Sequence, residues 1–254
     1  MPSQLSLCCQ DEAVEDTHQG YFICLKCLRI CQLKFFEYDI FLGGVWERYS
    51  SVPYKRIIKS VFSDLKIYDP KDYLGENWFA RNLQVLENSR SLLVMVPEFP
   101  FPLVAVEAGF YYAHHCPDKN SGLSNLVICW PEKVKPDWVK KNLFQLGQVA
   151  NSLEEAIIAL LNVLYRDQAK QLAKEVEIGS ADYNRHRLES VSNFTYSQEI
   201  GLLGGIRLEF EETGLREWTI SAPGLGKISA RDLEKVIMTF LATAIVKYLA
   251  NEAI

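Results

Sequence analysis

A lone carboxylate and a pair of glycines belong to two apolar segments that could share one active site. Residues 38–42 form an apolar run that ends in Gly43-Gly44, and residues 91–97 form a second run, which leads into a helical pattern containing Glu107. Each run has the length and composition of a buried strand that is followed by a loop. If the two strands are parallel neighbours, the glycine turn and Glu107 meet above their C-terminal ends, where open α/β sheets bind ligands.

Strand and helix patterns alternate around these residues. The apolar periodicity predicts helices over residues 53–65, 78–88 and 103–115, and further strands over residues 66–68 and 126–130. The alternation predicts right-handed crossovers and a doubly wound parallel sheet. The near-continuous apolar run 92–96 suits a strand that is buried on both faces of such a sheet.

The C-terminal part of the chain has a different pattern. A capping box over residues 152–155 predicts a helix from about residue 153 towards residue 172. Residues 179–205 show no clear period and are interpreted as a loop. Two alternating segments flank Thr213-Gly214, which is a β-hairpin signature, and a long apolar helix is expected to follow and to end near residue 250. We therefore expect a small α+β appendage.

The chain has 254 residues, enough for one α/β domain with additions. We divide it into a Cys-rich segment, residues 1–34, an α/β domain, residues 35–175, and a C-terminal region, residues 176–254. The net charge of -5 argues against broad nucleic-acid binding. Because the chain shows neither a secretory signal nor an uninterrupted long apolar segment, we expect a cytoplasmic protein without membrane partners. Its oligomeric state is open, and a homo-oligomer is one possibility.

Five of the seven cysteines lie within the first thirty-one residues. In a reducing compartment such crowding suggests metal chemistry before it suggests disulfides. The Cys24-x-x-Cys27 spacing suits a zinc knuckle, because a two-residue gap lets one turn supply two thiolates to the same ion. A structural zinc ribbon would need two further ligands, for which we choose Cys9 and His18, with Cys31 as the alternative to His18. The competing interpretation is an irregular N-terminus with reduced thiols.

The order of these motifs resembles the nucleoside 2-deoxyribosyltransferase-like proteins over residues 36–165. The resemblance rests on the strand that ends in Gly43-Gly44, on residues 68–70, on the strand over residues 92–96, and on Glu107-Ala108-Gly109. It implies a flavodoxin-like fold and cleavage of the N-glycosidic bond of a nucleoside, without a catalytic cofactor. Glu107 matches the position of the family's glutamate nucleophile, which holds the sugar covalently.

The chain departs from the family's pattern at the acidic residues around the nucleophile. An aspartate before the second strand is replaced by Ser89-Arg90-Ser91, and an aspartate in the loop ahead of the glutamate is absent. Asp69 and Glu98 are the available catalytic substitutes, because a second acid must protonate the leaving base. Asp72 is assigned to substrate binding. Arg90 suggests an anionic ligand such as a nucleotide, since a guanidinium pairs well with phosphate; the alternative is a surface arginine.

The residues after the glycine pair could contact the sugar and the base. Trp46 offers an aromatic face for stacking, and Arg48 lies two residues further on. We therefore assign Gly43, Gly44, Trp46 and Arg48 to substrate binding. The alternative is an exposed loop with one aromatic side chain buried for packing.

Two functions fit these residues. The first is an enzyme that cleaves the N-glycosidic bond of a nucleoside or nucleotide, by transfer or by hydrolysis, through Glu107. The alternative is a nucleotide-sensing binding module whose degenerate site signals to a protein partner through a terminal appendage. Turnover distinguishes the two, because a sensing module would be stabilised by its ligand without converting it.

Overall fold

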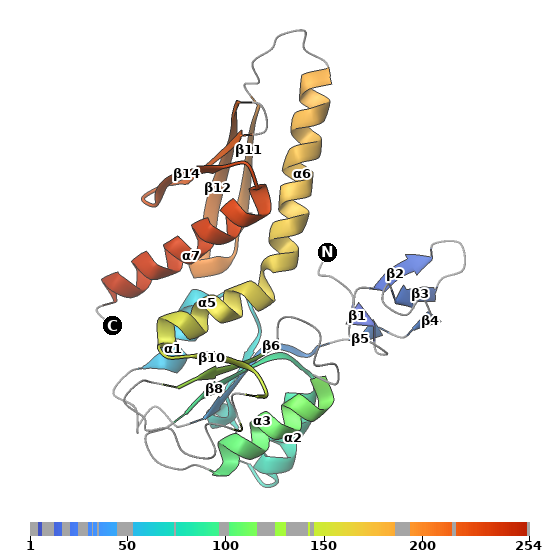
Figure 1. Cartoon of the computed structure of the whole chain (residues 1–254). Helices are drawn as coiled ribbons and strands as arrows, with labels where there is room; N and C mark the ends of the chain where they lie inside the picture. Colours follow the sequence, from blue (N-terminus) through green and yellow to red (C-terminus); the bar gives the residue numbers. More distant parts are fainter. Residues whose placement is uncertain are drawn as a thin grey trace.

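The computed structural model describes residues 5–6, 13–16, 21–24, 30–31, 33–34, 36–44, 53–73, 75–96, 102–115, 125–130, 142, 145–185, 194–214 and 217–252. Its central element is a five-stranded parallel sheet with the strand order β10-β9-β8-β6-β7 (Figure 1). The strands are β6 (Tyr38–Gly44), β7 (Ile67–Tyr68), β8 (Ser89–Met95), β9 (Leu126–Cys129) and β10 (Gln148–Ala150). The predicted parallel α/β sheet is therefore confirmed, and its strand order is consistent with a flavodoxin-like fold.

Helices cover both faces of this sheet. One layer contains α1 (Tyr54–Val61) and α5 (Leu153–Leu164), and the other contains α2 (Trp78–Glu87) and α3 (Pro102–His115). Ile40 and Leu42 of β6 face the first layer, whereas Phe41 between them faces the second. Because side chains alternate along a strand, residues 40–42 of β6 are apolar on both faces of the sheet.

The chain order of the strands reverses between β6 and β8. The two strands pair in parallel, with Gly43 opposite Val94 and Gly44 opposite Met95. Their C-terminal ends therefore lie at one edge of the sheet, at the switch point where doubly wound sheets bind ligands. The short turn η2 (Pro70–Asp72) follows β7 at the same edge.

A second unit follows the α/β unit. It consists of α6 (Arg166–Arg185), β11 (Thr195–Ile200), the turn η3 (Leu202–Gly204), β12 (Ile206–Gly214), β13 (Glu217–Ala222), β14 (Gly226–Ala230) and α7 (Leu233–Asn251). Its strands form an antiparallel sheet in sequence order, and α7 packs against β13, β14, α5 and α6 (Figure 1). The buried side chains of the α1–α5 layer and of the second unit form one continuous apolar cluster, and the division placed at residue 175 falls inside α6.

The structure corrects the prediction of a loop over residues 179–205. Residues 179–185 continue α6, and β11 lies within the same range. The Phe194 ring packs closely against the helix at Gly179, where an added Cβ would lie 3.1 Å from it. The position therefore favours glycine although it lies within a helix. In β11 only Ile200 is buried, so this edge strand lacks the alternation that would identify it.

The helix predicted from residue 153 towards residue 172 is two helices. The chain breaks at Tyr165, which is buried, packs its ring on Phe62 and donates a hydrogen bond to Asp64. These long-range contacts orient the start of α6 away from α5, and they are invisible in the local apolar pattern. The predicted hairpin is confirmed as β12 and β13, while the short strands β10 and β14 were not predicted.

The described strands of the N-terminal segment form two small antiparallel sheets. β2 (Ala13–Asp16), β3 (Tyr21–Cys24) and β4 (Ile30–Cys31) form an antiparallel sheet, and β1 (Leu5–Ser6) pairs with β5 (Leu33–Lys34). Cys24 ends β3, and the other predicted zinc ligands, Cys9, His18 and Cys27, lie outside the described residues. Across the described helices, none has the length and apolar character required to cross a bilayer.

Candidate active site at the switch point

Glu107 lies beside the glycine pair at the C-terminal edge of β6. Its side chain comes from the middle of α3 and is only 4% exposed. An added Cβ on Gly43 would lie 2.9 Å from Glu107 Oε2, so the carboxyl group occupies the space that the missing side chain leaves. The backbone amide of Gly44 donates a hydrogen bond to the same carboxyl group. The two segments therefore meet at one edge of the sheet.

Gly44 has a backbone conformation that suits glycine. Its φ is +105°, and an added Cβ would lie 2.2 Å from the carbonyl oxygen of Met95. Any side chain at this position would strain the backbone and collide with β8. The second glycine of the pair is thus required for the turn, and the first for the approach of Glu107.

Burial changes the chemistry of Glu107. Loss of hydration raises the pKa of its carboxyl group from 4.5 to about 7, while the Gly44 amide and the Lys55 ammonium act in the opposite direction. Both protonation states are therefore populated near neutral pH. A carboxyl group with a pKa in this range suits nucleophilic or acid–base chemistry at physiological pH, and such perturbed groups often mark functional sites.

A buried ion pair lies at the same edge of the sheet as Glu107. Lys55 of α1 donates to the carboxylate of Asp69, which follows β7, and both side chains are only 4% exposed. The same carboxylate accepts from the backbone amide of Lys71 at 3.1 Å and lies 3.6 Å from the Lys59 ammonium. Asp69 is therefore fixed at this edge, with its Oδ1 bonded to two protein donors and its Oδ2 close to the Lys59 ammonium.

Lys55 is a residue of this edge that was not predicted from the sequence. A signal was present, because Lys55 precedes Ile58 and Phe62 by three and seven residues and so shares the apolar face of its helix. Both of these neighbours are fully buried. A lysine at such a position must bury its ammonium or extend past the core, and a buried ammonium requires a carboxylate partner.

The other predicted site residues are placed differently. Asp72 lies at the same edge, but its side chain is 65% exposed and pairs with Lys59 at 3.2 Å. Arg90 lies near the N-terminal end of β8, about 16 Å along the strand from Met95. Its guanidinium lies 3.8 Å from Asp167, so the structure does not bring it to Glu107. The predicted residues Trp46, Arg48 and Glu98 lie outside the described residues.

The described side chains of His114, His115 and Cys129 do not join this site. His114 is exposed and stacks on Phe110 with ring centroids 4.1 Å apart, and His115 packs in the same way on Tyr111. Burial, with a smaller contribution from Glu155, raises the pKa of the Cys129 thiol to about 12, which fits a packing role in the core. Within the described ranges, no group of three or more His, Cys, Asp or Glu residues is arranged to hold a metal ion.

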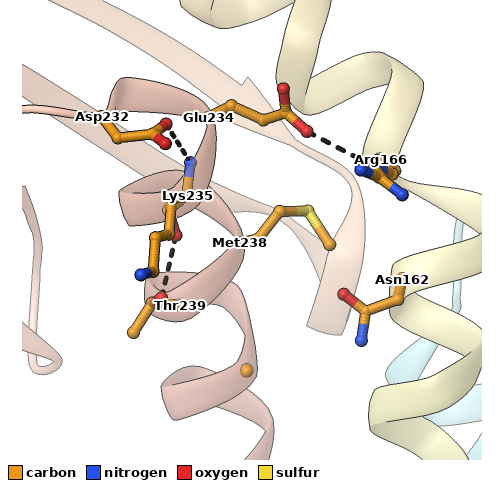
Figure 2. Close-up of a pocket in the computed structure, with 8 residues that line it drawn as sticks. Asn162, Arg166, Asp232, Glu234, Lys235, Met238 and Thr239 are labelled. Atoms are coloured by element: carbon orange, nitrogen blue, oxygen red, sulfur yellow. Dashed lines mark hydrogen bonds and ion pairs between the residues drawn. The ribbon is translucent and has the colours of Figure 1, made fainter.

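A separate groove of about 650 Å³ lies between the α5–α6 corner and α7 (Figure 2). Asn162 and Arg166 line one side, and Met238 points towards them from α7. Arg166 pairs with Glu234 at 3.4 Å, and their side chains are 49% and 35% exposed. The groove adjoins the α1–α5 layer, whereas Glu107 belongs to the opposite layer of the sheet, so the two features are distinct.

No protein-family model matches this sequence, and no curated protein matches it at a significant level. The resemblance to the nucleoside 2-deoxyribosyltransferase-like proteins therefore rests on the motifs themselves. The site must be interpreted from its geometry.

Proposed function

We propose that the protein cleaves the N-glycosidic bond of a nucleoside or nucleotide, with Glu107 as the nucleophile. The observation that carries this proposal is the buried carboxyl group of Glu107 at the switch point of the sheet, in contact with the glycine pair. A ligand held over the ends of β6 and β8 would present its reacting carbon to this group. The motif resemblance points to the same residue and the same reaction.

The proposed reaction has two steps. A carboxylate oxygen of Glu107 attacks the anomeric carbon of the sugar while the bond from that carbon to the base nitrogen breaks, and the bonding electrons leave with the base. The base takes a proton as it departs. Water or a second base then attacks the same carbon and releases Glu107, which gives hydrolysis or transfer respectively.

The proton for the leaving base must come from a second acid. Asp69 is a weak candidate, because its Oδ1 accepts from Lys55 and from the Lys71 amide and its Oδ2 lies 3.6 Å from the Lys59 ammonium, so two cations favour its ionised form. We therefore assign protonation to Glu98 and assign Asp69 to organising the site. Trp46 and Arg48 remain our choice for contacts with the base and the sugar, and Asp72 is exposed at the rim of the same edge.

The decisive experiment is a mass-spectrometric assay for free base with a panel of nucleosides, nucleotides and NAD. We expect the wild-type protein to release base from at least one of them and Glu107→Gln to lose at least about 10³-fold in rate. Glu87→Gln is the matched control, because Glu87 is exposed at the end of α2. A brief reaction stopped with acid should leave one sugar attached to the peptide that contains Glu107. Absence of turnover across the whole panel contradicts the proposal.

A second function, a nucleotide-sensing module, is favoured by the ion pair that holds Asp69 on Lys55 and makes it a weak acid for the leaving base. In that case the same edge binds the ligand without cleaving it, and an appendage contacts a protein partner. The panel should then raise the unfolding temperature without release of base, since a ligand that binds only the folded state stabilises it. Unchanged unfolding temperatures with every ligand would exclude this function.

A structural zinc in the N-terminal segment is a separate proposal. It assigns Cys9, His18, Cys24 and Cys27 as ligands, with the two thiolates of the Cys24-x-x-Cys27 knuckle bound as a pair. Metal analysis of the purified protein should find one zinc per chain, and Cys24→Ser should lower this content. An equal metal content in both proteins contradicts it.

A further inference from the structure

Two aromatic side chains at the start of α2 are exposed although they share the buried face of that helix. Trp78 is 43% exposed and Phe79 is 39% exposed, and their rings meet edge to face with centroids 5.9 Å apart. Trp78 is four residues before Asn82 and seven before Val85, and Phe79 is seven before Leu86. These three later residues are at most 2% exposed. The exposure of two adjacent rings on such a face requires an explanation.

The two rings lie at the edge of the sheet that holds Glu107. α2 leads from the C-terminal end of β7 back to the N-terminal end of β8, where Glu87 ends the helix and Ser89 begins the strand. Its ten residues span about 15 Å, so its first turn lies level with the C-terminal half of β8, where Val94 pairs with Gly43. α2 and α3 pack on each other in the same layer (Figure 1). The rings of α2 and the carboxyl group of α3 therefore border the same end of the sheet.

A buried hydrogen-bond donor lies one turn along α2 from the rings. Asn82 Oδ1 accepts a hydrogen bond of 2.9 Å from the Tyr68 hydroxyl, whereas the Nδ2 donor of Asn82 has no partner among the described residues. Helical side chains lean towards the N-terminus of their helix, so this amide is directed at the turn that carries Trp78 and Phe79. A buried donor without an acceptor is costly, and a ligand that supplies the acceptor recovers that cost.

We propose that Trp78, Phe79 and Asn82 form a subsite for a planar heterocyclic ring that carries a hydrogen-bond acceptor, such as a nucleobase. The ring packs on the two aromatic side chains, and one of its acceptors bonds to Asn82 Nδ2. A ligand reaches this amide when one of the exposed rings rotates. In naming the bound ring as the leaving base, the inference rests on the proposed function, whereas binding itself does not. Because a planar ring has two faces, this contact is compatible with stacking on Trp46.

The test measures binding to Glu107→Gln, so that turnover through Glu107 cannot consume the ligand. The probes are adenosine, guanosine, cytidine and uridine, with ribose as the probe that lacks a base. ¹⁵N NMR follows the Trp78 indole N–H and the Asn82 side-chain amide, which are identified by their loss in Trp78→Phe and Asn82→Leu. We expect at least one nucleoside to shift both signals and ribose to shift neither. Equal shifts with ribose, or no binding of any nucleoside, overturn the proposal.

The contribution of the rings is measured by removing each in turn. Trp78→Ala and Phe79→Ala should each raise the dissociation constant of the bound nucleoside by about 5- to 150-fold, the effect of losing one base–aromatic stack. Ile178→Ala is the matched control, because Ile178 is 51% exposed on α6, in the other unit. It should leave the dissociation constant unchanged. Unchanged dissociation constants in both ring variants also overturn the proposal.

The hydrogen bond from Asn82 is tested separately. Asn82→Leu leaves the Tyr68 hydroxyl without its buried acceptor, so this variant could fail to fold. The double variant Asn82→Leu/Tyr68→Phe removes both polar groups and should fold. We expect it to bind the nucleoside at least about fivefold more weakly than Tyr68→Phe alone, because the ligand acceptor loses its donor. Equal affinities of these two proteins overturn the proposal, since the donor then plays no part in binding.

Activity measurements separate this inference from the proposed function. If the wild type releases base, Trp78→Ala and Phe79→Ala should lower kcat/KM by the factor found for affinity, and Ile178→Ala should not. Base-dependent binding in a protein without turnover supports the subsite and rejects the enzyme. Release of base at an unchanged kcat/KM in both ring variants supports the enzyme and rejects the subsite.

Discussion

The edge of the sheet around Glu107 and the groove beside α7 both gather charged side chains, but they bury them to different extents. At the sheet edge, Glu107, Lys55 and Asp69 are each at most 4% exposed. In the groove, Arg166 and Glu234 keep 49% and 35% of their side-chain surface in water. The groove has a volume of about 650 Å³, yet its charges behave as ordinary surface charges.

This difference shows that a concave surface is by itself a weak guide to chemistry. The interaction between two charges grows as water is excluded, and the protonation equilibrium of a buried group shifts with it. Of these two regions, only the sheet edge combines burial, a carboxyl group with a pKa of about 7 and a backbone donor. If the comparison is right, substitutions at the sheet edge should have large effects that depend on pH, and substitutions in the groove should have small effects that depend on salt.

The largest effect is expected from the buried ammonium. Lys55→Met should lower the free energy of unfolding by about 3 to 5 kcal/mol, because removal of one partner leaves a buried charge uncompensated. Lys59→Met, at a 42% exposed position, should cost no more than about 1 kcal/mol. Urea denaturation of both variants at pH 7 measures the difference. Similar losses in the two variants would show that burial does not distinguish these lysines.

The next effect is the pH dependence that Glu107 confers on stability. Because the pKa is about 7 in the folded protein and 4.5 without burial, the native state holds a proton between these pH values that the unfolded chain releases. The stability contributed by this proton is fully present below pH 4.5 and is lost as the pH rises through 7, a total of roughly 3 kcal/mol.

Denaturation curves of the wild type and of Glu107→Gln across this range isolate the contribution, since all other groups are common to both proteins. The wild type should lose stability relative to the variant as the pH rises. Parallel pH profiles would mean that the carboxyl group is hydrated in the folded state.

The fold was predictable where burial leaves a local pattern. The strands β6, β8 and β9 and the helices α1, α2 and α3 follow from apolar runs and from helical spacing. Elements that depend on distant partners were missed. The break at Tyr165 requires Phe62 and Asp64, and Gly179 continues its helix beneath Phe194. Such contacts join residues far apart in sequence, and no window along the chain contains both partners.

The placement of the candidate site residues was predictable to a similar degree. Glu107 and the glycine pair were found together because both follow strands whose C-terminal ends must coincide in a parallel sheet. The same reasoning should have excluded Arg90 from the site, because Arg90 lies near the N-terminal end of its strand and so at the opposite edge of the sheet. Lys55 was overlooked because a charged residue within an amphipathic helix is usually solvated, and only its spacing from Ile58 and Phe62 marks it as buried.

A smaller effect is expected from filling the space in front of Glu107. In Gly43→Ala the new methyl group would lie 2.9 Å from Glu107 Oε2 and 3.3 Å from Leu92 Cδ1, which should cost about 1 to 2 kcal/mol as these side chains move. Gly109→Ala is the matched control in α3, where nothing lies within 4 Å of the added Cβ. It should stabilise the helix by roughly 0.5 to 1 kcal/mol.

These two glycine variants sharpen the comparison, because each adds one methyl group and the two are expected to change stability in opposite directions. The unfolding temperature should fall for Gly43→Ala and rise for Gly109→Ala. In Gly43→Ala the pH midpoint of the Glu107 titration, followed by NMR of the carboxyl carbon, should also change, since the carboxyl group must leave its position beside Gly44. Loss of stability without any change in that midpoint would place the collision at Leu92 instead of at Glu107.

The smallest effect belongs to the groove. A double-mutant cycle with Arg166→Ala and Glu234→Ala should give a coupling of about 0.2 to 1 kcal/mol at low salt, because the pair is 3.4 Å apart but largely hydrated. The coupling should decrease at 0.5 M NaCl, since salt screens exposed charges far more than buried ones. The same cycle on Lys55 and Asp69, with both replaced by residues of similar volume, should give a larger coupling with little salt dependence. A stronger coupling in the groove than at the sheet edge would reverse the comparison and direct the search for the active site to the surface between α5 and α7.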